Sequence, residues 1–228
     1  VKLEDMRGGS GLLQTFTPGL TPTFKDLITQ MIITSDNTAT DIMLNKLGMD
    51  RVNTFLREAG YLETTILSST GDLFRNLRAY SNPSAQDFSD REIFELQSPL
   101  HSDSNDHSFI FEGDSTKWLG RTTAREMGKL LEQLGNAELT SKESAEEMIA
   151  ILKNQMYSSR IPRLLRGKAT VAHKTGDWPP HAGNDVGILY YEGGPSIISV
   201  FTNQNRGDFV ELEATIGRIA EDLINTWN

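Results

Sequence analysis

The sequence contains no cysteine, no long apolar run and no excess of basic residues. Without cysteine, disulfide bonds and thiolate metal sites are excluded. No apolar run reaches the roughly 18–20 residues that a membrane-spanning helix needs, so no membrane span is expected. The 22 Lys and Arg residues stand against 31 Asp and Glu, and the resulting net charge of −9 disfavours nucleic acid as a partner.

The first part of the chain shows helical periodicity. Apolar residues over 24–32 recur at i, i+3, i+4, i+7 and i+8, which predicts one amphipathic helix. A second helix is predicted from about residue 37 to a stop at Gly48, with Leu47 among its inward residues, and a third over 50–59 with Asp50 as N-cap. Residues 68–120 are rich in Ser, Asn, Asp, Gly and Pro, and we expect a long loop there with a helical turn near 89–97.

The second part changes from helices to strands. Helices are predicted from Thr123 and from about Thr140, followed by strands at 170–174, 186–191 and 197–202 and a closing helix over 209–227. This order predicts an α+β fold. We expect one domain over 1–228, with a helical part at about 20–168 and a sheet part at about 169–228. Three strands make a thin sheet beside this much helix, and two or three more would be expected.

Two tripeptides could carry chemistry. Alone, Ser35-Asp36-Asn37 is typical of a helix N-cap, and Lys174-Thr175-Gly176 is typical of a strand that ends at a turn. Together, one between helices and the other on a strand, they match two of the three motifs of a known acyl-transfer signature, whose third is Ser-x-x-Lys. No Ser or Thr of the chain has a Lys three positions later. The nucleophile of that signature is therefore absent from these residues.

The catalytic candidates are Ser35 and Lys174. Acyl transfer on a lactam needs a proton path to the leaving nitrogen, and a hydroxyl can both accept and donate a proton. The Lys174 ammonium would stabilise negative charge and make it easier for Ser35 to give up its proton. We therefore expect these two side chains to meet in one cleft.

The substrate-binding candidates flank them. The Asn37 amide can donate to a substrate carbonyl, and the Thr175 hydroxyl can bind a substrate carboxylate. The backbone of Gly176 and the residues after it can dock a peptide-like substrate along the strand edge, with the N–H near Asp177 in an oxyanion hole. Asp36 is expected to orient its own loop.

These motifs resemble those of class A β-lactamases and related penicillin-recognising serine hydrolases. The resemblance covers the chain except 68–120 and includes the segments Gly9–Gln14, Leu27–Ala39, Arg121–Ala124, His173–Gly176 and Asn184–Ile188. It implies a β-lactamase/transpeptidase-like fold, no cofactor and a bacterial periplasmic or secreted location. It also implies a β-lactamase-type serine hydrolase that opens β-lactam rings through an acyl-enzyme, as in antibiotic resistance. The ligand would be a β-lactam or a cell-wall peptide.

The family places its Ser-x-x-Lys helix, with two strands, before the segment that begins here. We therefore expect an N-terminal segment carrying the nucleophile to be missing, with a separate N-terminal fragment as one possible partner. A relative without a nucleophile is the alternative. The alternative function is that of a penicillin-binding sensor or a D,D-peptidase-like protein. Such a protein becomes acylated by the ligand but does not deacylate efficiently.

Two further positions depart from the family pattern. The loop Glu-x-x-Leu-Asn, whose Glu activates the hydrolytic water, has no clear match; Glu92 is a candidate deacylation base or simply an exposed helical glutamate. Val186 stands where many members have an Arg for the substrate carboxylate. Arg160 is the candidate replacement, with an ordinary surface arginine as the alternative.

Between His101 and His107 the spacing of donors matches no metal site, and none is expected.

Overall fold

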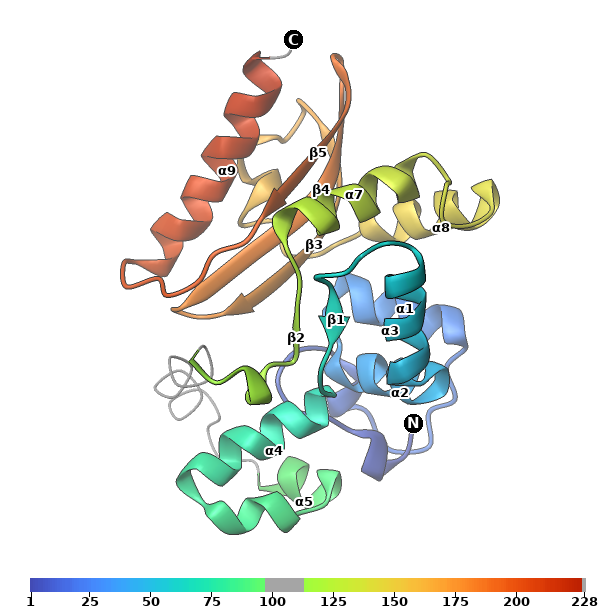
Figure 1. Ribbon diagram of the computed structural model, residues 1–228, viewed down its shortest axis with the longest axis vertical. Coiled ribbons are helices and arrows are strands. Elements are labelled where there is room, and N and C mark those ends of the chain that lie inside the picture. Colours follow the sequence, from blue (N-terminus) through green and yellow to red (C-terminus); the bar gives the residue numbers. More distant parts are fainter. Residues whose placement is uncertain (97–112, 227–228) are drawn as a thin grey trace. The chain divides into compact units, whose positions relative to one another are not determined.

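The computed structural model describes residues 1–96 and 113–226, and the chain forms two compact units, Val1–Thr122 and Thr123–Asn228 (Figure 1). In the described residues the first unit is mainly helical, and the second combines helices with an antiparallel sheet. The α+β prediction is confirmed. The division falls before the helices of 124–152, which therefore belong with the sheet rather than with the earlier helices. Whether 1–228 is one domain stays a prediction.

In the first unit, two short 3-10 helices are followed by three consecutive α-helices. A short two-stranded antiparallel pair, β1 with β2, accompanies them, and Thr65 of β1 is paired with Arg121 of β2. The elements are η1 (Leu3–Asp5), η2 (Leu13–Thr15), α1 (Phe24–Ile33), α2 (Asn37–Leu47), α3 (Met49–Glu58), β1 (Thr65–Ile66), α4 (Thr70–Ser81), η3 (Pro83–Asp87), α5 (Asp90–Glu95), η4 (Ser115–Lys117) and β2 (Gly120–Arg121).

The apolar stripe predicted for α1 packs against α2. Leu27 of α1 is buried with Ala39 and Met43 of α2 and with Leu13, and together they form the core of this part of the unit. Two details of the prediction are wrong. Leu47 is 48% exposed rather than inward. Gly48 (φ +85°), and not Asp50, is the N-cap of α3, because one glycine ends α2 and starts the next helix.

The predicted loop over 68–120 is wrong at its start, because residues 70–81 form helix α4. Ser69 caps it by accepting a hydrogen bond from the Asp72 N–H, and the Asp72 side chain bonds back to Ser69. Only Leu77 of its apolar residues is buried, which explains why the periodicity looked weak. The helical turn predicted near 89–97 is confirmed as α5.

The second unit is built on a three-stranded antiparallel sheet in the order β3-β4-β5. The strands extend further than predicted at the β3–β4 hairpin. Ser141, rather than Thr140, caps the second helix. The elements are α7 (Ala124–Gly135), α8 (Lys142–Leu152), η5 (Ile161–Leu164), β3 (Thr170–Trp178), β4 (Ala182–Tyr191), β5 (Gly194–Val200) and α9 (Phe209–Thr226).

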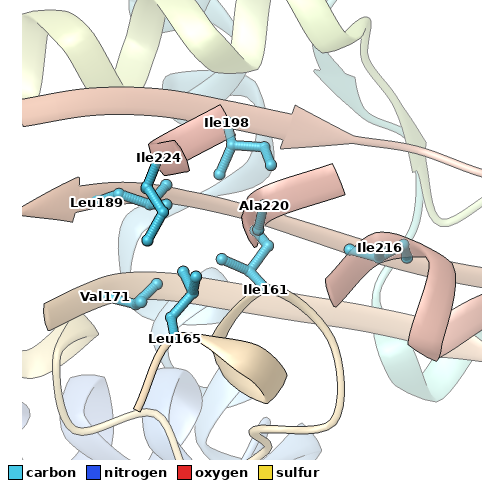
Figure 2. Packing of buried hydrophobic residues seen from close by; sticks show 8 residues of the cluster. All are labelled: Ile161, Leu165, Val171, Leu189, Ile198, Ile216, Ala220 and Ile224. Atoms are coloured by element: carbon cyan, nitrogen blue, oxygen red, sulfur yellow. The ribbon is translucent and has the colours of Figure 1, made fainter. Parts of the chain in front are cut away.

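The main core of this unit lies between one face of the sheet and α9. Figure 2 shows apolar side chains from α9, the three strands and the η5 region converging there. The buried members are Ile161, Leu165, Val171, Leu189, Ile198, Ile216, Ala220 and Ile224. Because strand residues alternate between faces, Ile188 and its neighbours on the other face meet α7, where Gly135 lies close to Ile188. The sheet is thus covered on both faces.

Candidate functional site

The connection between α1 and α2 carries Ser35 in an uncommon backbone conformation. Its φ is +53°, in the left-handed region that few non-glycine residues adopt. Asp36 follows as N-cap of α2 and is fully buried. Its Oδ1 accepts from the Ala39 N–H at 2.9 Å and its Oδ2 from the Leu13 N–H at 2.8 Å. Asp36 therefore orients its own loop, as the sequence predicted.

A glycine-rich segment lies directly against this connection. Asn37 donates from its backbone N–H to the Ser10 carbonyl at 3.1 Å and from Nδ2 to the Gly8 carbonyl at 2.9 Å. A Cβ at Gly11, whose φ is +104°, would lie 2.3 Å from the Asp36 carboxyl group, so only glycine fits there. The Asn37 amide has two N–H donors, and one is used within the chain.

A buried ion-pair network also holds helix α2 through Asp41. This network was not expected from the sequence. Asp41 of α2 is 1% exposed and accepts from Arg7 Nε at 2.7 Å. Its two oxygens also accept from the backbone N–H groups of Thr70 and Gly71 at 2.8 and 2.9 Å. Arg7 Nη2 reaches Asp90 of α5 at 2.6 Å. This network links α2, α4 and α5. In the sequence, its only sign is an Asp among the inward-facing residues of α2.

In the second unit, β3 presents Lys174, Thr175, Gly176 and Asp177 in succession. Lys174 is largely buried, and its Nζ donates to the Thr175 carbonyl at 2.5 Å. Burial lowers the pKa of Lys174 from 10.5 to about 8, the negative charges of Asp177 and Asp185 oppose that change, and Arg160 adds to it. An amine with this pKa exchanges its proton near neutral pH, which suits acid–base chemistry.

The side chain before Lys174 points away from it, as strand alternation predicted. His173 Nδ1 lies 2.9 Å from Asp185 Oδ1 in the interior beneath α9. Asp185, which is fully buried, also accepts from the Ile161 N–H at 3.0 Å. This pair fixes β3 to β4 and to η5, so it holds the strand that presents Lys174.

Arg160 lies just before η5 and is 3% exposed rather than on the surface. Its Nη2 lies 3.1 Å from Asp177 Oδ2 and 3.2 Å from Glu213 Oε1, and its Nη1 donates to the Asn184 carbonyl at 3.1 Å. The structure therefore brings two of the predicted binding residues, Arg160 and Asp177, into direct contact. Their 17-residue separation gave no sign of this pairing.

Glu92 lies in the first turn of α5. Its exposed carboxylate accepts from the Ser89 N–H at 2.8 Å and from the Ser89 hydroxyl at 2.7 Å, which closes a capping box. These hydrogen bonds, the side-chain one above all, lower the pKa of Glu92. The structure gives this residue a capping role, and its role as deacylation base stays a prediction.

The predicted site residues thus fall into two groups. Ser35 and Asn37 lie together in the first unit, and Lys174, Thr175, Gly176, Asp177 and Arg160 lie together in the second. The meeting of Ser35 with Lys174 stays a prediction. Within 1–96 and 113–226, no group of three or more His, Asp or Glu side chains could hold a metal ion. The segment from His101 to His107 lies outside the described residues.

Residues 1–227 match the model of the β-lactamase enzyme family (Beta-lactamase2). The chain belongs to this family. No curated protein matches it.

Solved structures of similar fold include β-lactamases and PBP-A. A β-lactamase from Sphaerobacter thermophilus DSM 20745 is 22% identical, with a TM-score of 0.75 over 100% of this chain and 72% of that one. A β-lactamase from Chitinophaga pinensis DSM 2588 is 18% identical, with a TM-score of 0.75 over 100% and 74%. A PBP-A variant in an acyl-enzyme complex with penicillin G is 19% identical, with a TM-score of 0.69 over 98% and 70%. The family and fold predictions are confirmed. No helix among the described residues is both long and apolar enough to cross a membrane.

Proposed function

We propose that this chain forms the proton-transfer and substrate-binding parts of a β-lactamase-type serine hydrolase that opens β-lactam rings through an acyl-enzyme. Its nucleophilic serine would lie on a segment outside these 228 residues. Membership of the β-lactamase enzyme family supports the reaction class. The observation that carries the proposal within the chain is the largely buried amine of Lys174, which lies 2.5 Å from the Thr175 carbonyl on the strand that also holds Gly176. Its burial lowers the pKa of Lys174 to about 8.

In this proposal Lys174 and Ser35 work as a pair. The Lys174 ammonium stabilises the negative charge that develops when Ser35 passes its proton to the lactam nitrogen. The unusual φ of Ser35, held by the buried Asp36 next to it, sets the direction of its hydroxyl. Asn37 and Thr175 bind the amide carbonyl and the carboxylate of the ligand. No cofactor takes part in these steps.

A second candidate is a protein that acylates but deacylates poorly, as a penicillin-binding sensor or a D,D-peptidase-like enzyme would with β-lactams. The hydrogen bonds that the Glu92 carboxylate already accepts favour this second candidate. A deacylation base must accept a proton from water, whereas the Glu92 carboxylate already holds two hydrogen bonds from Ser89 and has a lowered pKa.

One experiment separates these functions. The protein, expressed with the residues encoded upstream of Val1, is incubated with a chromogenic cephalosporin, and its intact mass is then measured. Continued colour formation supports the hydrolase, and a stable adduct without turnover supports the acylating binder. Neither colour nor adduct would contradict both.

The role of Lys174 is tested with Lys174→Ala, which should remove most acylation. Lys142→Ala is the matched control, because Lys142 is an exposed lysine at the start of α8 with the same charge. Acylation that survives unchanged in the Lys174 variant would refute the role assigned to that amine.

A further inference from the structure

The guanidinium of Arg160 is bound by two carboxylates at one nitrogen. Nη2 contacts both Asp177 and Glu213, at 3.1 and 3.2 Å, and the Arg160 side chain is 3% exposed. The ring of Phe209 lies 5.6 Å from its Cζ and covers it further. Two negative charges therefore compete for one positive charge, and the cluster carries a net charge of −1.

The two carboxylates hold different positions around Arg160. Glu213, on α9, has a side chain that is 15% exposed and also accepts from the Ser159 hydroxyl at 2.5 Å, so it fixes the arginine from the interior. Asp177, near the end of β3, has a side chain that is 43% exposed. Asp177 therefore takes the side of the guanidinium that a ligand could reach.

Asp177 is also well placed to meet a ligand. Alternate residues of a strand project from the same face, about 7 Å apart, so Asp177 lies on the same face of β3 as Thr175. The proposed function gives the Thr175 hydroxyl a ligand carboxylate. Such a carboxylate would find the accessible side of Arg160 already taken by Asp177, and it would meet a like charge there.

We propose that Asp177 is a specificity-determining residue whose carboxylate occupies Arg160 in place of an anionic ligand group. The site consequently disfavours ligands with a carboxylate at this position and accepts those that are neutral or cationic there. This inference rests on the proposed function for the location of the ligand. Among the β-lactams and cell-wall peptides of that proposal, it predicts a preference for those without a negative charge beside Thr175.

A binding experiment that needs no acylation tests the occupancy of Arg160. Sodium acetate is titrated into ¹⁵N-labelled protein while the Arg160 Nε–H resonance is followed, its assignment made by loss of the signal in Arg160→Lys. In Asp177→Asn the resonance should shift with saturation, because the guanidinium is now open to an anion, whereas the parent should not respond. Asp222→Asn, which removes one exposed charge on α9, should behave like the parent. Equal responses in parent and Asp177→Asn would overturn the proposal.

The second measurement compares acylation by penicillin G and by its methyl ester, which differ only in the carboxylate, using protein that includes the residues encoded upstream of Val1. Asp177→Asn should raise the acid-to-ester ratio of acylation rate constants about tenfold or more, the effect of one charge-assisted hydrogen bond. An unchanged ratio would overturn the proposal. If neither compound acylates any variant, the proposed function fails, and the acetate titration still decides the occupancy of Arg160.

Discussion

The burial of Lys174 should make this residue costly to the folded state, and Lys174→Met measures that cost. A pKa of about 8 instead of 10.5 corresponds to about 3 kcal/mol of unfolding free energy. Below pH 8 the lysine is charged in both states, so the folded protein bears the full cost. Between pH 8 and 10.5 the folded state loses the proton while the unfolded state keeps it, so the cost disappears as pH rises through this window.

Methionine removes the charge and keeps the length of the side chain. Allowing for the lost bond to the Thr175 carbonyl, we expect Lys174→Met to be more stable than the parent by about 1–2 kcal/mol at pH 7. This advantage should fall by about 3 kcal/mol between pH 7 and pH 10.5 and change sign. Urea unfolding of both proteins across this range, with Lys142→Met as the control, measures the difference. A stability difference that does not vary with pH would refute the assigned pKa.

Three further predictions test the rest of the site. Arg7→Met should cost about 3–5 kcal/mol in urea unfolding, because Asp41 keeps its buried charge without its cation, whereas Arg91→Met at an exposed pair should change stability by less than about 1 kcal/mol. Equal costs would contradict the assigned network. Ser35→Gly should raise stability by about 0.5–1 kcal/mol, because glycine tolerates φ +53°, while acylation falls sharply; a variant that acylates normally would exclude the serine from proton transfer. The acylation rate of the parent should decline above pH about 8, as the Lys174 ammonium loses its proton, and Lys174→Ala should lack this decline. A parent rate that is flat from pH 7 to 10 would argue against a charged lysine.

The elements that could be predicted from the sequence are those whose signals are local. The stripe of α1 repeats apolar residues at helical spacing, and the three strands are apolar or β-branched runs between turns, so each was found close to its true position. Helix α4 was missed because only Leu77 of its apolar residues is buried and because part of its first turn is bound by a distant residue in addition to the local Ser69–Asp72 capping box. The N–H groups of Thr70 and Gly71 are satisfied by the Asp41 carboxylate, which lies about 30 positions earlier.

In the candidate site, too, the features with local sequence signals could be predicted and those that depend on long-range packing could not. The motifs at 35–37 and 174–176 could be located because they are contiguous, and the capping role of Asp36 follows from its residue type. The pairing of Arg160 with Asp177 depends on how η5 packs against the sheet and α9, and no spacing rule supplies that. The sequence therefore named both residues as ligand-binding candidates without showing that one neutralises the other.

A double-mutant cycle on acylation tests most directly whether Ser35 and Lys174 act in one site. Acylation rate constants for penicillin G are measured for the parent, Ser35→Ala, Lys174→Ala and the double variant, all with the residues encoded upstream of Val1. If the two side chains form one proton path, the double variant should acylate about as slowly as the slower single variant, since the second change removes nothing further. Losses that multiply in the double variant would show that the hydroxyl and the amine act independently, and would contradict this account.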